Sequence, residues 1–205
     1  IFRFFTKSII SSSRPFGHKR YIIPPQGSEH VTKGLNNQLS LSEIKVFFKP
    51  NVDWLRKKTL NTFNKNSYVI IIPGTSKSGI YKRWSSTKYA KLAKFLEEKN
   101  IEIIVAGTLD DMESAQSIFS TCLNAKNLLG KSSPATLYNL SLDAKFIISN
   151  DTGPALLASL SNTPLLWIVN DNNISKSNEP IGDNVIKVCA KEINQVSVDL
   201  VKTTL

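Results

Sequence analysis

A short polar run, Ser149-Asn150-Asp151-Thr152-Gly153-Pro154, has the residue types that bind a phosphate or a sugar. It follows an apolar stretch, and proline is tolerated in the first turn of a helix, so the run is expected to join a buried strand to a helix. Free N–H groups at the start of that helix would favour an anion, and Gly153 would let a ligand approach the backbone. Asp151 and Thr152 add side chains for a sugar hydroxyl or a metal. Capping of the helix by Asp151 is the alternative that needs no ligand.

A second polar loop, residues 75–85, follows Pro73-Gly74 and is rich in hydroxyl groups and cations. Because it comes after the apolar run 68–72, these groups would gather at the carboxyl end of a buried strand, where they suit an anion. The alternative is a solvated basic loop whose Trp84 packs on the core.

Two further segments carry groups that nucleotide-binding proteins use. Asp110 and Asp111 follow another apolar run, where an acid commonly binds ribose hydroxyls, although acids also favour the first turn of any helix. Residues 125–132 read Ala-Lys-Asn-Leu-Leu-Gly-Lys-Ser, a relaxed form of the phosphate-binding loop of kinases and ATPases. Its interior lacks glycine, but a P-loop phosphotransferase stays open as an alternative.

These loops need a scaffold, which the hydrophobic pattern indicates beyond residue 67. Short apolar runs alternate with stretches of helical periodicity. Strands are predicted at 68–72, 101–106, 128–129, 145–149, 165–169 and 185–188, and helices at about 86–99, 110–122, 134–142, 154–160 and 197–204. The alternation predicts an α/β fold, a Rossmann-like doubly wound parallel sheet covered on both faces. Such sheets bind ligands at the carboxyl ends of their strands.

Residues 1–66 are broken by Pro and Gly, with a short strand expected at 21–23 and helices at about 29–38 and 52–63. This segment holds 12 Lys and Arg against 3 Asp and Glu, whereas residues 67–205 hold 14 against 13. A uniformly basic domain would suggest nucleic acid. A basic and aromatic end favours an anionic membrane surface at least as much, and a solvated basic face is the third explanation.

The composition of the 205 residues excludes several classes of protein. A hydrophobic content of 41% supports a packed core. Two cysteines cannot form a disulfide framework, and no Cys and His residues have zinc-site spacing, so a reducing, cytoplasmic compartment is expected. No apolar run reaches the roughly 18 residues of a membrane-spanning helix. Because the chain starts with Ile and its only Met is Met112, we expect part of a longer protein or a processed one.

The polar loops, in this order and spacing, resemble the C-terminal lobe of the family 9 glycosyltransferases, which include the lipopolysaccharide heptosyltransferases. The resemblance runs from about Val69 to Leu205. Four segments carry it. The first has Pro-Gly-Thr-Ser at 73–76, Lys-Arg-Trp at 82–84 and Tyr-Ala-x-Leu-Ala at 89–93, and the second has Ala-Gly-x-x-Asp-Asp-x-Glu at 106–113. The third has Asn-Leu-x-Gly-Lys-Ser at 127–132, and the fourth has Ser-Asn-Asp-Thr-Gly-Pro at 149–154 with Ala158 and Thr163-Pro164.

The resemblance implies a GT-B architecture, in which two Rossmann-like lobes enclose the active site. Residues 67–205 would be the lobe that binds a nucleotide-sugar donor such as ADP-heptose, and residues 1–66 the tail of the acceptor lobe and the linker. The donor-binding residues that it implies are Thr75, Ser76 and Lys82 for the phosphates, Asp111 for the ribose, where the family usually has Glu, and Asp151, Thr152 and Gly153 for the diphosphate and sugar.

The resemblance also implies sugar transfer with inversion, and no metal or other cofactor. A general base would deprotonate the acceptor hydroxyl while the donor site stabilises the departing nucleoside diphosphate. That base is expected in the N-terminal lobe, so the catalytic residue is unknown and the fragment alone is expected to be inactive. The acceptor would be a glycolipid, the lipopolysaccharide core or another envelope glycan. The protein is expected to be cytoplasmic, with possible peripheral contact to an anionic membrane. No nucleic-acid partner is expected.

Two positions depart from the family pattern. Leu156 stands where the family usually has His in Asp-Thr-Gly-Pro-Met-His, and Asn170-Asp171-Asn172 stands where it tends to have Gly-Pro-Thr. Losing one hydrogen bond to a charged group costs about 1.5–3 kcal/mol, or about 10- to 150-fold in affinity. These departures keep a second function open, a nucleotide-sugar-binding module that no longer transfers sugar.

Overall fold

The computed structural model describes residues 10–11, 19–20, 22, 25, 27–41, 43–44, 51–56, 63–172 and 176–205. The chain divides into two compact units. The smaller unit comprises residues 1–51 and 173–178, and the larger unit comprises residues 52–172 and 179–205. All of the predicted donor-binding residues belong to the larger unit.

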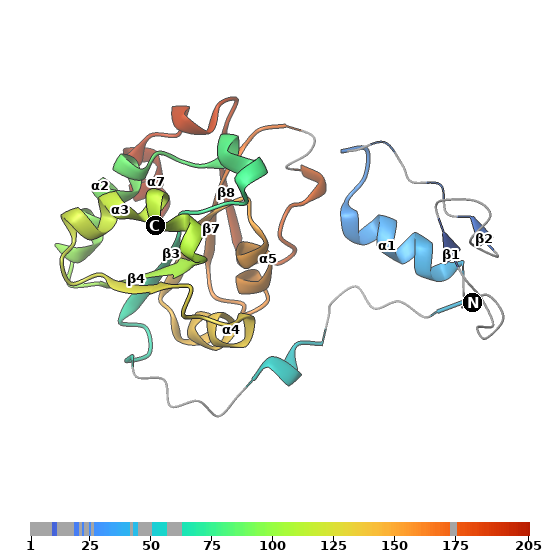
Figure 1. Ribbon diagram of the computed structural model, residues 1–205, viewed down its shortest axis with the longest axis horizontal. Helices are drawn as coiled ribbons and strands as arrows, with labels where there is room; N and C mark the ends of the chain where they lie inside the picture. The colour runs from blue at the N-terminus through green and yellow to red at the C-terminus, as the bar shows by residue number, and fades with distance from the viewer. Residues whose placement is uncertain are drawn as a thin grey trace. The chain divides into compact units, whose positions relative to one another are not determined.

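The described part of the larger unit is built on a six-stranded sheet in the order β5-β4-β3-β6-β7-β8, in which every neighbouring pair is parallel (Figure 1). The strands are β3 (Tyr68–Ile72), β4 (Glu102–Gly107), β5 (Lys126–Leu129), β6 (Phe146–Asn150), β7 (Leu165–Asn170) and β8 (Val185–Ala190). Ile70 of the central strand β3 pairs with Ile104 of β4 and with Ile147 of β6. All five residues of β3 are buried, as expected for a parallel sheet covered on both faces. The predicted doubly wound α/β fold is confirmed.

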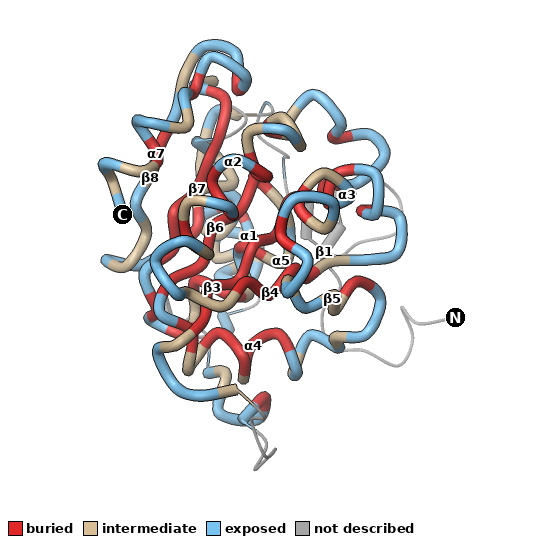
Figure 2. The backbone as a smooth tube through the Cα atoms, turned by 90° about the vertical axis from the view of Figure 1, so that its left-hand side faces the viewer, coloured by how far each residue is buried: buried red, intermediate tan, exposed pale blue. Residues whose placement is uncertain are grey.

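Helices cover both faces of this sheet. On one face lie α2 (Ser86–Glu97), α3 (Met112–Thr121) and α7 (Val198–Thr204), and on the other α4 (Pro134–Asp143) and α5 (Gly153–Ser159). One core joins Leu92 and Ile118 to Val69, and the second joins Leu137 to Ile70. Val69 and Ile70 enter different cores because successive strand residues point to opposite faces. Figure 2 shows the buried strands between helices whose outer surfaces are exposed.

Several short 3-10 helices were not expected from the sequence. The loop at 75–85 contains η3 (Lys77–Lys82), α3 follows η4 (Leu109–Asp111), and η5 (Ile193–Gln195) precedes α7. Turns of this length carry too little apolar periodicity to be recognised. The helix expected at 52–63 is wrong at its start, where η2 (Asp53–Leu55) forms, and residues 57–62 lie outside the described part.

The smaller unit contains two short parallel strands, β1 (Ile10–Ser11) and β2 (Lys19–Arg20), and helix α1 (Val31–Ser40). α1 begins two residues later than expected, after His30, whose side chain accepts a hydrogen bond from Thr32 N at 3.2 Å. Residues 21 and 23 of the predicted strand lie outside the described residues. The division of the chain at residue 66 stays a prediction. Among the helices that the structure describes, none has the length and apolar character to cross a membrane.

Candidate functional site

The two polar loops leave the sheet where its strand order reverses. β3 and β6 are neighbours, but β4 and β5 lie beyond β3 whereas β7 and β8 lie beyond β6. The connections after two such strands diverge and leave a crevice at the carboxyl ends, which is where open α/β sheets bind ligands. Residues 73–84 leave β3 at this crevice, and residues 151–154 leave β6.

An ion pair joins the two loops. Lys82 Nζ donates a hydrogen bond to Asp151 Oδ2 at 2.7 Å. The Asp151 side chain is 6% exposed and the Lys82 side chain 20% exposed, so the pair is shielded but the ammonium group remains accessible. An ammonium group has three N–H donors, and this is the one hydrogen bond that Lys82 makes within the described part of the chain. Two of its N–H groups are therefore available to a ligand.

Asp151 does not cap the helix that follows it, so that alternative is wrong. The N-cap of α5 is Thr152, whose backbone carbonyl accepts a hydrogen bond from Ala155 N at 3.0 Å and whose side chain makes no capping bond. Gly153 is exposed, and a Cβ atom there would meet nothing within 4 Å. Thr152 and Gly153 thus present open surface next to the ion pair.

The loop after β3 offers backbone N–H groups rather than the Thr75 hydroxyl. Thr75 is buried, and its hydroxyl donates to Gly79 O at 2.8 Å and accepts from Arg83 Nε at 3.1 Å. In the described part of the chain, no acceptor contacts the N–H groups of residues 76–78. Consecutive free N–H groups form concavities that bind anions. The backbone of this loop therefore has free N–H groups, whereas the Thr75 hydroxyl is already bonded.

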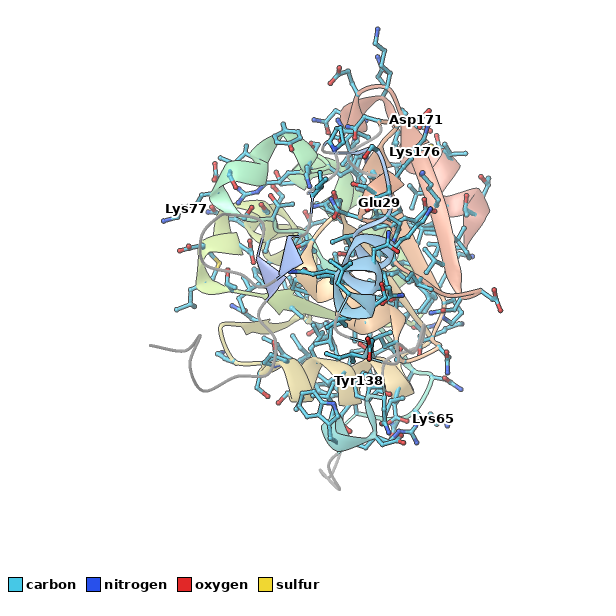
Figure 3. The ribbon with its side chains drawn as sticks, turned by 90° about the vertical axis from the view of Figure 1, so that its right-hand side faces the viewer. Glu29, Lys65, Lys77, Tyr138, Asp171 and Lys176 are labelled. Atoms are coloured by element: carbon cyan, nitrogen blue, oxygen red, sulfur yellow. The ribbon has the colours of Figure 1, made fainter. Side chains whose placement is uncertain are left out.

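Among the charged side chains of this loop, Lys82 is the one that contacts the loop after β6. Lys77 projects into solvent, as Figure 3 shows, and its Nζ lies 3.7 Å from Asp110 Oδ2. Ser76 is also exposed, with its Oγ 3.2 Å from Ser78 Oγ. Ser76 can therefore contribute a hydroxyl group as well as its N–H.

Arg83 joins the two ends of the loop after β3 and reaches α3, contacts that the sequence analysis missed. Its Nη2 donates to Thr75 O at 3.0 Å, and its Nη1 lies 3.6 Å from Glu113 Oε2 in α3. The Arg83 side chain is largely buried, whereas that of Glu113 is exposed. The Lys-Arg-Trp motif contained Arg83, but nothing in the spacing indicated that it contacts Thr75.

Asn150 is a second residue that the sequence analysis left without a role. It is fully buried, its Oδ1 accepts from Trp84 N at 3.1 Å and from Tyr89 OH at 2.9 Å, and its Nδ2 donates to Pro73 O at 2.7 Å. Burial raises the pKa of the Tyr89 hydroxyl, which keeps the hydroxyl protonated as a donor. Asn150, the residue before Asp151, thus ties the end of β6 to the segments that follow β3 and η3 and to α2. The packing of Trp84 on the core is confirmed.

Asp111 lies against the same loop. Its Oδ2 accepts hydrogen bonds from Thr108 N at 2.8 Å and from Thr108 Oγ1 at 3.0 Å. The side chain is buried and packs directly on Gly74, where an added Cβ atom would stand 1.9 Å from Asp111 Oδ1. The predicted contact of Asp111 with a ribose stays a prediction.

The Gly-Lys-Ser segment forms a tight turn. Gly130 has a φ of 68°, its N–H donates to Gly107 O at 2.9 Å, and Lys131 N donates to Leu128 O at 3.1 Å. A phosphate-binding loop would offer these N–H groups to its ligand. The turn also follows β5, which is an edge strand of the sheet. Both observations disfavour a phosphotransferase.

One cavity of the larger unit lies away from the two loops. A cavity of about 1220 Å³ lies between α2, α3 and α7, and none of the predicted donor-binding residues lines it. Within the described ranges, no group of three or more His, Cys, Asp or Glu side chains is placed to hold a metal ion.

The solved structures that resemble this chain include three glycosyltransferases. The E. coli heptosyltransferase WaaC with ADP matches with a TM-score of 0.72 and 18% identity, over 92% of this chain and 59% of that chain. The family 9 glycosyl transferase from Veillonella parvula matches with a TM-score of 0.72 and 15% identity, over 93% and 62%. E. coli ADP-heptose lps heptosyltransferase II matches with a TM-score of 0.60 and 21% identity, over 67% and 44%. At these identities the likeness establishes the fold, and the chain spans less than two thirds of each structure's length.

The sequence was also compared with curated proteins and with family models. No curated protein matches the chain. Residues 45–204 match the model of glycosyltransferase family 9 (heptosyltransferase), which is more than half of the chain. That region contains both loops of the crevice and the whole six-stranded sheet. The chain belongs to glycosyltransferase family 9.

Proposed function

We propose that this chain is the donor-binding half of a sugar transferase, which moves a sugar from a nucleoside diphosphate to a lipopolysaccharide or another envelope glycan. The observation that carries the proposal is the Lys82–Asp151 ion pair, 2.7 Å long, at the point where the strand order reverses. It places a cation with free N–H groups and a buried carboxylate side by side, which suits a phosphate next to a sugar hydroxyl.

The groups around the ion pair fit the parts of a nucleotide-sugar. The N–H groups of residues 76–78 and the Lys82 ammonium would bind phosphate oxygens. Asp151, Thr152 and Gly153 would bind the sugar and the adjoining phosphate. The solved structures of WaaC with ADP and with ADP-2-deoxy-2-fluoro heptose support an adenine nucleotide as the donor.

The proposed reaction breaks the bond between the sugar's anomeric carbon and the phosphate oxygen. The acceptor hydroxyl oxygen forms the new bond from the opposite side, and a general base outside this half takes its proton. Negative charge develops on the departing phosphate, where Lys82 and the N–H groups of residues 76–78 would stabilise it. No metal is required, because these groups supply the positive charge. The half alone would bind a donor without transferring its sugar.

Binding of nucleotides to the 205-residue chain tests this proposal. We expect ADP to bind more tightly than GDP, UDP or ATP in a calorimetric titration. Lys82→Met and Asp151→Asn should each weaken ADP binding by about 10-fold or more, because each removes a charged partner from a shielded pair. Lys131→Met is the matched control, since within the described residues the exposed Lys131 side chain bonds only to a carbonyl of its own turn.

The outcome separates a donor-binding half from a P-loop phosphotransferase. Loss of ADP binding in Lys131→Met but not in Lys82→Met would establish a P-loop phosphotransferase instead. A folded chain with no affinity for any of the four nucleotides would overturn the proposal.

A non-catalytic nucleotide-sugar-binding module is the second candidate. The observation that favours it is Leu156, an apolar side chain that is 39% exposed on α5, where the family usually has His. Donor binding by the full-length protein, with neither sugar transfer nor donor hydrolysis, would identify this function. Transfer that Leu156→His accelerates would instead place the chain among active transferases.

A further inference from the structure

Trp54 lies at the surface of the larger unit, unlike the other two tryptophans of the chain. It is 76% exposed, whereas Trp84 and Trp167 are 1% and 0% exposed. Tryptophan is highly buried on average in folded proteins, because its ring is large and mostly apolar. The exposed indole of Trp54 is therefore a candidate contact surface, and the residues around it indicate for which kind of partner.

The backbone that carries Trp54 is fixed on α4. Trp54 is the middle residue of η2, where Leu55 N donates a hydrogen bond to Val52 O at 2.9 Å. Leu55 is 4% exposed, and its carbonyl accepts a hydrogen bond from Asn139 Nδ2 of α4 at 2.8 Å. Figure 1 shows this short helix, in teal, beside α4. The indole is thus held out to solvent on a fixed base.

Cations surround Trp54 in the sequence. Residues 45–65 contain six Lys and Arg and one acid, Asp53. Three of the cations, Arg56, Lys57 and Lys58, follow Trp54 within four positions. Arg56 Nε lies 3.6 Å from Asp53 Oδ1, but both side chains are more than half exposed, and ion pairs of this kind are weak. The exposed indole therefore has a positively charged neighbourhood.

An exposed indole beside several cations fits the surface of an anionic lipid bilayer. Tryptophan is enriched at the level of the headgroups, where its apolar ring and its N–H group both find suitable surroundings. Each Lys or Arg near such a surface raises the affinity about fivefold. Nucleic acid would attract the same cations, but it stacks on successive aromatic rings, and Trp54 is the one aromatic residue between Phe48 and Phe63.

We propose that Trp54, together with Arg56, Lys57 and Lys58, is a contact site for an anionic lipid bilayer. The indole enters the headgroup region, and the cations bind lipid phosphates. Because η2 is fixed on α4, this contact holds the larger unit, which contains the crevice, at the membrane. The inference does not depend on the proposed donor site.

The fluorescence of Trp54 tests the contact, because the buried Trp84 and Trp167 are shielded from solvent in any case. The 205-residue chain is titrated with vesicles of phosphatidylcholine, with and without phosphatidylglycerol. With the anionic vesicles, we expect the emission to shift to shorter wavelength and quenching by acrylamide to fall, since the indole leaves water. With the neutral vesicles, we expect neither change.

Trp54→Ala should weaken co-sedimentation with the anionic vesicles by about 10-fold or more, because the apolar area of the indole is lost. Leu123→Ala is the matched control. Leu123 is 86% exposed, but a single cation, Lys126, follows it within four positions, and its replacement should change the affinity by less than twofold. Both variants should unfold at the same denaturant concentration as the wild type, which separates loss of the contact from damage to the fold.

Sedimentation with anionic vesicles while the Trp54 emission stays unchanged would overturn the inference, because the membrane would then be bound elsewhere. Wild-type affinity of Trp54→Ala, or an equal emission shift with neutral vesicles, would overturn it as well. An emission shift that single-stranded RNA causes and anionic vesicles do not would assign the surface to nucleic acid instead. A shift that grows with protein concentration in the absence of vesicles would assign it to a second copy of the chain.

Discussion

Asn150 and Arg83 show how single residues build the candidate site without contacting a ligand. Both are largely buried, and their polar atoms bond to backbone carbonyls, a hydroxyl group or a backbone N–H of the loop after β3. A buried polar group without a hydrogen-bond partner lowers the stability of the fold by about 1–3 kcal/mol. The polar atoms of these two residues accordingly have partners within the protein. The groups that stay free, on Lys82 and on the backbone of residues 76–78, lie where a ligand can reach them. Positioning and binding are thus assigned to different residues.

Tyr89→Phe tests the Asn150 network. The change removes the hydrogen bond to Asn150 Oδ1 but keeps the ring, whose centroid lies 4.9 Å from that of Trp84. We expect a loss of about 1 kcal/mol in the free energy of unfolding, measured with a chemical denaturant. Tyr81→Phe is the control, because Tyr81 is exposed, and it should change stability by less than about 0.5 kcal/mol. Equal stability of Tyr89→Phe and wild type would show that the network contributes nothing.

The pH dependence of that difference follows from the raised pKa of Tyr89. The folded protein keeps the Tyr89 proton at a pH at which the unfolded chain releases it, near pH 10. The wild type therefore loses stability as pH rises above about 10, whereas Tyr89→Phe lacks this contribution. In denaturant unfolding, the stability advantage of the wild type should therefore shrink as pH rises above about 10.

At the scale of elements, the sequence predicted the strands and helices that have a periodic apolar pattern and missed the short 3-10 helices that lack one. The β-branched run of β3 and the amphipathic pattern of α2 were recognised because buried strands and half-buried helices have distinct periods. η3 has no such period, so its residues were expected to form an irregular loop. Lys82 and Asp151 were both predicted as site residues, but their contact depends on β3 lying beside β6. No local pattern specifies which strands are neighbours.

Gly130→Ala tests the turn between β5 and α4. At a φ of 68° alanine is strained, and its Cβ would stand 2.6 Å from Leu109 Cγ, so we expect a loss of at least about 1 kcal/mol in stability. Gly153→Ala is the matched comparison, because the added Cβ meets no atom within 4 Å. It should leave the unfolding free energy within about 0.5 kcal/mol of the wild type. Equal effects of the two changes would contradict the assigned turn.

At the scale of the whole molecule, charge is unevenly divided. The net charge is +10, and residues 1–66 contribute nearly all of it. Anionic lipids attract such segments, and the attraction weakens as salt screens it. We therefore propose that the basic segment 1–66 attracts the chain to an anionic membrane surface.

Co-sedimentation with lipid vesicles tests that attraction. We expect binding to vesicles with anionic lipid, none to neutral vesicles, and loss of binding near 1 M salt, where the screening length falls to about 3 Å. Lys57→Gln with Lys58→Gln, in the basic segment 1–66, should weaken binding more than Lys91→Gln with Lys131→Gln, which removes the same charge from residues 67–205. Equal binding to neutral and anionic vesicles would refute membrane attachment through charge.

The ion pair at the crevice also links ligand binding to folding. Lys82 and Asp151 are 69 residues apart in the chain, and the Trp84–Asn150 hydrogen bond spans 66. Contacts of such long range form only once β3 and β6 have come together, so the crevice is absent from the unfolded chain. A ligand at about 100 times its dissociation constant would thus stabilise the larger unit by about 2.7 kcal/mol. Ligand binding at the crevice and unfolding of the sheet are therefore linked equilibria.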